Sequence, residues 1–146
     1  MTTTIAPILK SVVVPVPPAR AFAHFTEGLG RWWPLATHSI FGEQAETAVM
    51  EGRVGGRVYE RAADGRVGEW GEVLAWEPPR RVVFSFMKYH AGVALTEVEV
   101  AFTAVAGGTR VDLEHRGWEA APDQRHGYDE GWDVVFGQCF AGSDWS

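Results

Sequence analysis

The sequence predicts an α+β fold in which a curved antiparallel sheet of about six to seven strands surrounds a long C-terminal helix. Short β-like segments follow one another across tight turns, and strands this close in sequence pair antiparallel. One or two short helices fit after the first strand. The end of the chain carries an apolar stripe at helical spacing, and this helix is the only expected element long enough to cover the apolar face of the sheet.

Length and composition are those of one globular domain, which we expect to span residues 1–146. Hydrophobic residues make up 46% and charged residues 22% of the chain, as in an ordinary globular protein. Seven tryptophans and eight phenylalanines are an unusual number. Because large rings are costly to leave in water, these side chains either fill a thick core or line an internal site.

The charge and the ends of the sequence argue against several classes of partner. The formal net charge is −6 and the Lys and Arg residues are scattered, which argues against nucleic-acid binding. No apolar run approaches the ~20 residues of a membrane-spanning helix. The N-terminus has no secretory signal pattern, and the single cysteine, Cys139, cannot form an internal disulfide. We therefore expect a protein of the reducing cytoplasm.

The first part of the chain predicts a strand followed by short helices. Residues 8–14 are apolar and β-branched, which is typical of a strand. Prolines at 17–18 open a helix whose apolar residues recur every three to four positions. Residues 31–34, RWWP, begin a second short helix or a rigid loop, and the segment from there to Gly42 has no clear period.

The middle of the chain predicts six further strands, of which two form a hairpin in the stretch EWGEVLAWEPPRRVVFSF. Proline fixes φ and donates no hydrogen bond, so Pro78 and Pro79 end one strand, and the next runs to about Lys88. The clearest period-two pattern spans residues 96–103. The other expected strands occupy residues 47–51, 57–61 and 110–116.

The last element is an amphipathic helix that begins near Pro122. Apolar residues recur along it at i, i+3 or i+4, and i+7, which gives one broad aromatic stripe. Acidic and amide side chains fall on the opposite face. The stripe consists of Tyr128, Trp132, Val135, Phe136, Cys139 and Phe140.

The order of elements and several short motifs resemble a known family. The motifs are Trp32-Trp33, Gly55-Gly56-Arg57, Asp64-Gly65, the hairpin WEPPRRVVF at 76–84, GGTRV at 107–111 and Gly131-Trp132. From about Ile8 to Phe140 the chain resembles bacterial homologues of the C-terminal domain of the heat-shock-protein-90 ATPase activator, within the START-like (SRPBCC, Bet v 1-like) superfamily.

The resemblance implies a helix-grip fold with a deep hydrophobic cavity between the sheet and the long helix. Members of the superfamily bind lipids, sterols and polyketides, and some catalyse cyclisation or hydrolysis. The eukaryotic activator uses a separate N-terminal domain to engage its chaperone, and this chain has no room for one. The resemblance therefore does not predict a chaperone contact.

Aromatic side chains of the sheet, the last helix and the loops are the natural lining of such a cavity. Each of them fits a plain hydrophobic core equally well, since cavities in this fold are made from core positions. The predicted aromatic lining consists of Trp33, Phe41, Trp70, Phe84, Phe86, Trp118, Trp132 and Phe136.

Strand alternation also directs three ionisable side chains toward the cavity. His115 is in phase with Val111 and Leu113, Glu60 with Val58, and Glu72 with Trp70, Leu74 and Trp76. Such groups could orient a polar ligand or move a proton. A structural, hydrogen-bonded His115 is the alternative, and one bulge would reverse every inward assignment after it. His24, His38, His90 and His126 are scattered on predicted helices and loops, where we expect them at the surface.

Three functions fit these features. The leading hypothesis is a binding protein for a small apolar or aromatic ligand, without a cofactor or metal, because the zinc-ligand spacings and phosphate-binding glycine loop are missing. The second is an enzyme that uses Glu60, Glu72 and His115 as acid–base groups. The third is an interaction module, either a chaperone-interacting stress-response partner or a homodimer, which needs an exposed apolar patch such as Trp32, Trp33 and Trp145.

Overall fold

The architecture is a seven-stranded antiparallel sheet with a helix across its concave face. It was obtained as a computed structural model that describes residues 5–86 and 96–146. The strands are β1 (Ile8–Val14), β2 (Ala45–Met50), β3 (Arg57–Ala62), β4 (Val67–Glu77), β5 (Arg81–Phe86), β6 (Thr96–Val105) and β7 (Gly108–Arg116). The helices are α1 (Pro18–Thr26), α2 (Leu29–Trp32), η1 (Gly42–Gln44), η2 (Trp118–Ala120), η3 (Pro122–Gln124), α3 (Arg125–Val134) and η4 (Val135–Phe140).

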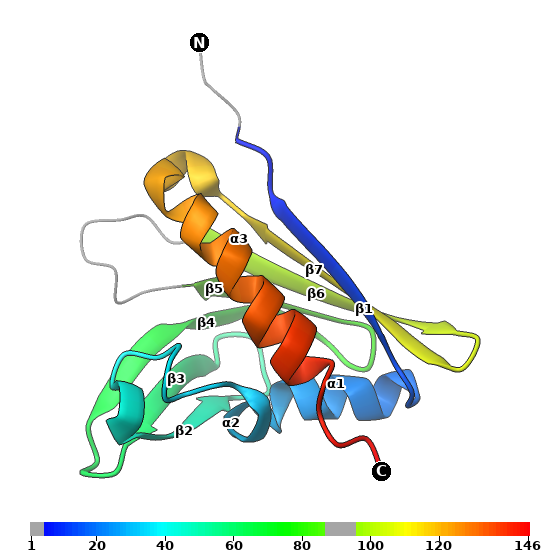
Figure 1. The fold of residues 1–146 in the computed structure, drawn as a ribbon, viewed down its shortest axis with the longest axis horizontal. Coiled ribbons are helices and arrows are strands. Elements are labelled where there is room, and N and C mark those ends of the chain that lie inside the picture. Colours follow the sequence, from blue (N-terminus) through cyan, green and yellow to red (C-terminus); the bar gives the residue numbers. More distant parts are fainter. Residues whose placement is uncertain (1–4, 87–95) are drawn as a thin grey trace.

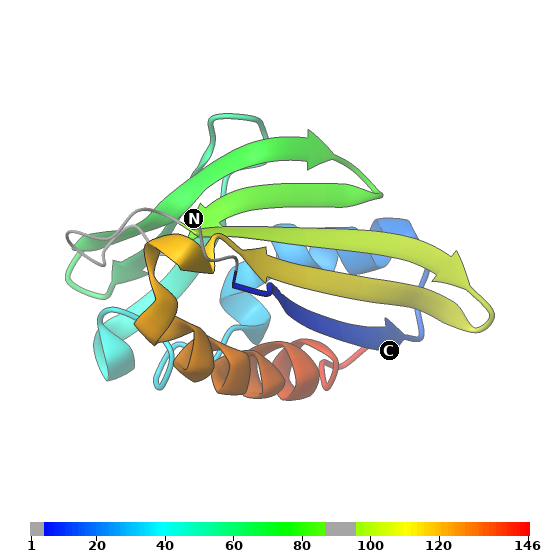
Figure 2. The same ribbon diagram turned by 90° about the horizontal axis from the view of Figure 1, so that it is seen from above.

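The sheet has the strand order β1-β7-β6-β5-β4-β3-β2, and each neighbouring pair is antiparallel. The first strand thus pairs with the last, and the two short helices α1 and α2 cross from β1 to the opposite edge strand, β2 (Figure 1). The long helix, α3 continued by η4, lies along the concave side of the curved sheet (Figure 2). The predicted α+β helix-grip fold is confirmed.

The strands form where the sequence alternates, and their inner faces make the core. Val98, Val100 and Phe102 are at most 4% exposed, whereas Glu97 and Glu99 between them face the outside. These residues belong to β6, and a hairpin turn at Gly107, where φ is +83°, joins β6 to β7. The predicted end of the β4–β5 hairpin near Lys88 lies outside the described residues.

The last helix differs in one respect from the regular amphipathic helix that the sequence predicts. It is α-helical to Val134 and then continues as a π-helix, η4. Phe136 and Phe140, four residues apart, both point into the core, where their rings stack with centroids 5.5 Å apart and an interplanar angle of 2°. The aromatic stripe therefore stays on the sheet side to the end of the helix.

Strand β4 contains two bulges that reverse part of the predicted alternation. Its pairing with β3 passes from Val58–Gly71 to Tyr59–Glu69 and so skips Trp70. Its pairing with β5 skips Leu74 in the same way. As a result Glu72 and Leu74 are exposed on the outer face, and the prediction that they point inward is wrong.

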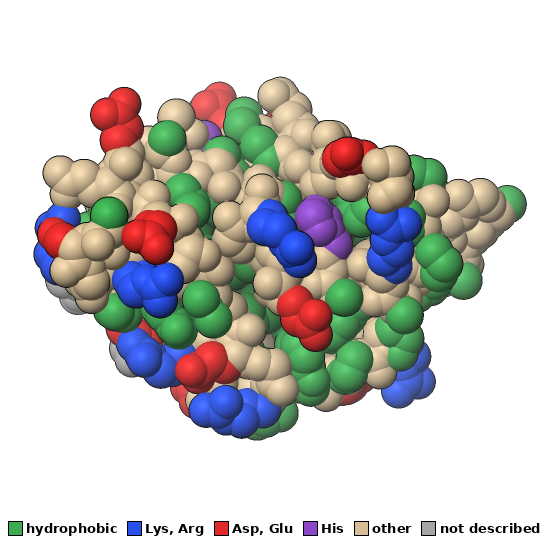
Figure 3. Space-filling view, turned by 90° about the horizontal axis from the view of Figure 1, so that it is seen from below, with side chains coloured by type: hydrophobic (Ala, Val, Ile, Leu, Met, Phe, Trp, Pro, Cys, Tyr) green, Lys and Arg blue, Asp and Glu red, His purple; other side chains and the backbone are tan. Residues whose placement is uncertain are grey.

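The surface of the molecule mixes charges of both signs. On the lower side of Figure 1, where α1 and the C-terminal end lie, Lys and Arg side chains are interspersed with Asp and Glu among hydrophobic and other polar groups (Figure 3). None of the helices within residues 5–86 and 96–146 is both long and apolar enough to cross a membrane.

The tryptophans expected on an exposed patch lie in the interior instead. Trp32 and Trp33 are only 6% and 7% exposed. The Trp32 indole packs between Phe25 and Phe140, at centroid distances of 5.1 Å from each. Trp145 is half-buried and its ring packs against Phe140. The predicted exposed apolar patch is therefore wrong, because all three rings contribute to core packing.

Candidate functional site

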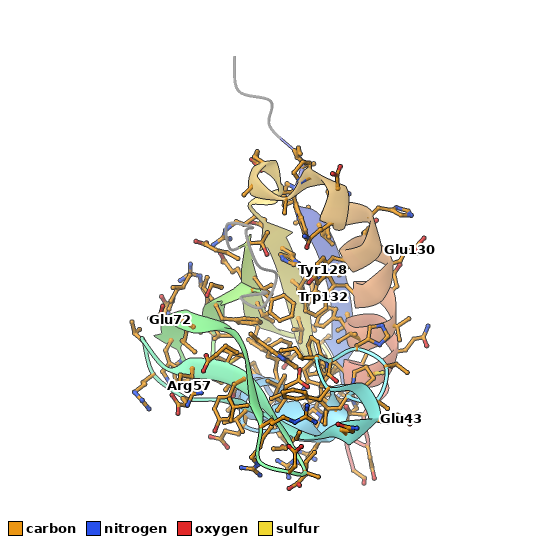
Figure 4. All side chains as sticks on the ribbon, turned by 90° about the vertical axis from the view of Figure 1, so that its left-hand side faces the viewer. Glu43, Arg57, Glu72, Tyr128, Glu130 and Trp132 are labelled. Carbon is orange, nitrogen blue, oxygen red and sulfur yellow. The ribbon has the colours of Figure 1, made fainter. Side chains whose placement is uncertain are left out.

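A cavity of about 220 Å³ lies between α3, the end of β5 and the loop that follows α2. Figure 4 shows Tyr128 and Trp132 pointing from α3 toward the sheet, while Glu130 on the same helix points away from it. The described side of the cavity is lined by Trp33, Thr37, His38, Ser39, Phe86, Tyr128, Gly131, Trp132 and Val135.

One wall of the cavity is aromatic. The rings of Phe86 and Trp132 are stacked, with centroids 5.8 Å apart and an interplanar angle of 30°. The ring of Trp33 stands perpendicular to that of Trp132, at 5.7 Å and 88°. Ring edges are electropositive and ring faces electronegative, so such a wall can hold another aromatic ring either stacked or edge-on.

The other wall is polar, and the loop after α2 supplies it through three consecutive residues. The Thr37 hydroxyl and the Nδ1 atom of His38 are 2.8 Å apart. The Ser39 hydroxyl donates a hydrogen bond to the carbonyl oxygen of Leu35 at 2.5 Å. The indole N–H of Trp33 donates to the carbonyl oxygen of His38 at 2.7 Å, which joins the two walls. Among the described lining residues none is Lys, Arg, Asp or Glu.

Glu60 lies behind the polar wall and holds it against the sheet. Its carboxylate is fully buried. One oxygen accepts hydrogen bonds from the backbone N–H of Ile40 and the indole N–H of Trp70, both at 2.7 Å. The other accepts from the backbone N–H of Phe41 at 3.1 Å. All three donors are neutral groups, so the carboxylate is engaged by the loop and the sheet rather than by a cation.

His115 lies behind the aromatic wall as a buried, fully hydrogen-bonded imidazole. The indole N–H of Trp132 can only donate, and it lies 3.0 Å from Nδ1, so Nδ1 is unprotonated. The proton is then on Nε2, which donates to the Thr96 hydroxyl at 2.7 Å, and that hydroxyl donates to the carbonyl oxygen of Phe86. Burial lowers the pKa of His115 from 6.5 to about 3.

The three ionisable residues predicted to face the cavity do not converge. Glu60 and His115 do point inward, as the alternation predicts, and both are 0% exposed. Glu72 lies on the outer side of the sheet (Figure 4). Because an acid–base group must reach the same reacting atoms as its partner, the hypothesis that these three residues act together is wrong.

The predicted aromatic lining divides into residues at the cavity and residues packed behind it. Trp33, Phe86 and Trp132 line the cavity. Phe41 is half-buried, with the Arg66 guanidinium 4.7 Å from its ring centroid. The remaining four, at most 2% exposed, belong to the surrounding core: Trp70, Phe84, Trp118 and Phe136.

Sequence reasoning missed most of the polar wall. His38 was expected at the surface, yet it is half-buried at the cavity, and Thr37 and Ser39 had no periodic pattern to mark them. His24 was also expected at the surface and is half-buried against Phe140. His126 is exposed as expected, and His90 lies outside the described residues. Tyr128 and Val135 were recognisable only as part of the helical stripe.

Comparison with known proteins adds three kinds of result. A family model described as "Activator of Hsp90 ATPase homolog 1-like protein" matches residues 15–139. Among curated protein sequences, none matches the chain significantly. Many solved structures share the fold.

Three of these structures illustrate the range of similarity. CalU16 from Micromonospora echinospora is 20% identical with a TM-score of 0.66, over 92% of this chain and 71% of CalU16. A protein described as the anthrahydroquino-gamma-pyrone synthase Txn09, solved as a complex, is 27% identical with a TM-score of 0.63, over 97% of this chain and 99% of the synthase. DynU16, from the dynemicin biosynthetic locus, is 18% identical with a TM-score of 0.69, over 94% of this chain and 46% of DynU16.

Proposed function

The chain belongs to the family of Activator of Hsp90 ATPase homolog 1-like proteins, and from this premise we propose that it binds a small, neutral aromatic molecule in the cavity between the sheet and α3. The observation that carries the proposal is the pairing of two unlike walls. Trp33, Phe86 and Trp132 offer ring surface, and the loop opposite offers hydroxyl and imidazole groups. A planar molecule with one polar edge satisfies both walls at once.

The size and charge of the cavity narrow the class of ligand. Drug-sized molecules occupy pockets of roughly 300–1,000 Å³, so a cavity of about 220 Å³ suits one or two fused rings. An ionised group placed there would lose its hydration, and the described lining has no charged side chain to compensate it. We therefore favour a phenol-like or other uncharged aromatic over a carboxylate or an amine.

A structural relative supports the aromatic nature of the ligand. The similar protein that is 27% identical over nearly the whole of both chains is described as an anthrahydroquino-gamma-pyrone synthase. CalU16 and DynU16, at 20% and 18% identity, support the fold alone. No acid–base catalytic role is proposed, because Glu60, Glu72 and His115 do not converge on the cavity.

The test compares three probes with the same fused two-ring carbon skeleton by isothermal titration calorimetry. 2-Naphthol has a planar ring system and a neutral polar edge, decahydro-2-naphthol keeps the hydroxyl without the aromatic rings, and 2-naphthoate carries a charge. We expect 2-naphthol to bind at least about tenfold more tightly than either of the others. No detectable binding of any of the three would contradict the proposal.

A matched pair of helix variants locates the binding. A Cβ atom added at Gly131 or at Gly127 meets no heavy atom within 4 Å, but only Gly131 lines the cavity. Gly131→Leu should abolish 2-naphthol binding because its side chain takes up space in the cavity, whereas Gly127→Leu should bind like the wild type. Both changes improve helix propensity, so neither is expected to unfold the protein.

A further inference from the structure

The loop that forms the polar wall has no helix or strand between Pro34 and Phe41. Two of its backbone amides are nevertheless held by hydrogen bonds to a side chain of the sheet. The N–H groups of Ile40 and Phe41 are successive donors to one carboxylate, that of Glu60. Successive amides of this kind form a concave anion-binding turn. Hydrogen bonds to an ionised acceptor are about twice as strong as neutral ones, so this contact fixes the loop more firmly than a neutral partner would.

The same carboxylate also supports the aromatic wall. It accepts the indole N–H of Trp70 at 2.7 Å, and the Trp70 ring packs 4.8 Å from the ring of Trp33, which lines the cavity. Trp33 in turn donates to the carbonyl oxygen of His38 in the loop. Glu60 therefore connects to both walls without lining the cavity itself.

A second feature of the sheet, independent of charge, serves the same loop. Gly68 on β4 is the cross-strand partner of Glu60. A Cβ atom at Gly68 would lie 2.5 Å from Cδ1 of Ile40 and 3.3 Å from Cε2 of Phe41. The missing side chain leaves the space in which these two loop residues sit. Two adjacent positions of the sheet are thus adapted to dock the loop, one by its charge and the other by its lack of a side chain.

We propose that Glu60 is a positioning residue of the cavity. Its carboxylate acts as a latch that holds the loop of residues 34–41 against the sheet, so that Thr37, His38 and Ser39 stay in place opposite the aromatic wall. When the latch is broken, the polar wall moves away and the ligand is held less tightly and released faster. The part of this inference that concerns the ligand rests on the proposed function.

The latch is tested first without a ligand, by amide hydrogen exchange. In Glu60→Gln an amide N–H₂ replaces one carboxylate oxygen and opposes a backbone N–H, so that a hydrogen bond is lost. Exchange at Ile40 and Phe41 should become at least about tenfold faster, while exchange at Val98 and Val100 in the sheet stays unchanged. Glu72→Gln, the same substitution on the outer face, should leave all four amides unaffected.

The second arm measures binding of 2-naphthol to the same variants. Glu60→Gln should weaken the affinity about tenfold and raise the dissociation rate in stopped-flow measurements, and Glu72→Gln should match the wild type. Gly68→Ala keeps the carboxylate and presses mainly on the Ile40 and Phe41 side chains, while Cγ of Glu60 is in ordinary contact at 3.4 Å. It should therefore change both measurements in the same direction as Glu60→Gln. If Glu60→Gln does not fold, Gly68→Ala provides the test in its place.

The outcomes separate this inference from the proposed function. If the wild type does not bind 2-naphthol, the proposed function fails, and the exchange rates still decide whether Glu60 latches the loop. If Ile40 and Phe41 exchange at wild-type rates in both variants, the latch is refuted. Faster exchange with an affinity within about twofold of the wild type would show that the loop does not position the ligand, and would equally overturn the proposal.

Discussion

His115 is held in one tautomer and one protonation state by its neighbours. The Trp132 indole donates to Nδ1, and Nε2 donates to the Thr96 hydroxyl. A second proton on the ring would place two N–H donors against each other. The imidazole therefore behaves as a structural link between α3, β6 and β7, and the Trp132 ring at the cavity owes its orientation to this link.

This arrangement predicts that His115 lowers stability in acid. Its pKa is about 3 in the folded protein and about 6.5 in the unfolded chain. Between these values the unfolded state binds more protons, so stability falls as the pH drops from 6.5 toward 3. At about 1.36 kcal/mol per pKa unit, the loss from this residue is on the order of 3 kcal/mol at pH 4.5.

Urea unfolding of the wild type and His115→Gln at pH 7 and pH 4.5 checks this. The variant should be less stable at pH 7, by about 2 kcal/mol, because it loses a packed ring. At pH 4.5 the gap should close or reverse, since only the wild type has the titrating group. His126→Gln, which changes an exposed histidine, should follow the wild type at both values. An equal gap for His115→Gln at the two pH values would contradict the assignment.

For individual residues, the sequence predicted the site mainly where a regular period marks them, and Trp33 was predicted from its aromatic ring without such a period. Trp33, Phe86 and Trp132 were within the predicted lining, and Glu60 and His115 were correctly placed inside. Their roles were not predictable, because they depend on partners far away in the sequence. The polar wall was not predicted because its position also depends on a contact between residues distant in the sequence. This contact is the hydrogen bond from the backbone N–H of Ile40 to Glu60.

At the scale of elements, β4 shows how a local irregularity changes the outcome of a correct pattern. The sequence alternates from Trp70 to Trp76, but the bulge at Trp70 turns Glu72 outward, and a second bulge follows at Leu74. Bulges have no strong sequence signal of their own beyond an unexplained glycine in a strand. Gly71 was such a signal, and it lies at the first bulge.

Gly71→Ala should be strongly destabilising. A Cβ atom at this position would overlap the carbonyl oxygen of Ser85 on the neighbouring strand β5. Because backbone cannot move aside as a side chain can, we expect a loss of about 3 kcal/mol in the free energy of unfolding, measured by urea titration. Gly127→Ala, in open space on α3, is the control and should be neutral or slightly stabilising. A wild-type midpoint for Gly71→Ala would refute the close approach of the two strands.

Lys10 joins β1 to the last helix. Its Nζ atom lies 2.8 Å from carboxylate oxygens of both Asp129 and Asp133. The hydrogen bond to Asp129, and to a smaller extent the one to Asp133, raises the pKa of Lys10 above its usual value. The ammonium form of Lys10 is therefore the form that both carboxylates stabilise. The pair of carboxylates is one turn apart on α3, which suits a single ammonium group between them.

Lys10→Met should lower stability by about 1 kcal/mol or less, because the ion pairs are partly exposed. The loss should shrink in 1 M salt, where such interactions are screened. Chemical denaturation with urea at low and high salt measures both effects. Arg110→Met, which removes an ion pair to Asp112 within one strand, should change stability less. A loss that is independent of salt would indicate that the lysine acts through packing rather than charge.

For the molecule as a whole, the helix-grip arrangement explains why a core this rich in aromatic residues contains a cavity. The sheet is curved and the helix is straight, so rings fill most of the space between them and leave room near the end of β5 (Figures 1 and 2). The succession of strands along the chain and the covering helix follow from the sequence, because turn residues and periodicity are local signals. The pairing of β1 with β7, which lie far apart in the sequence, does not. The position and size of the cavity depend on non-local packing and needed the structure.

Because the cavity exists only in the folded state, its ligand must stabilise the fold. At a free concentration of 100 times Kd, 2-naphthol should raise the free energy of unfolding by about 2.7 kcal/mol. Calorimetric melting curves at increasing 2-naphthol should show a rising Tm for the wild type and for Gly127→Leu. Gly131→Leu, whose side chain takes up cavity space, should show no rise. An equal rise in all three proteins would place the ligand elsewhere on the molecule.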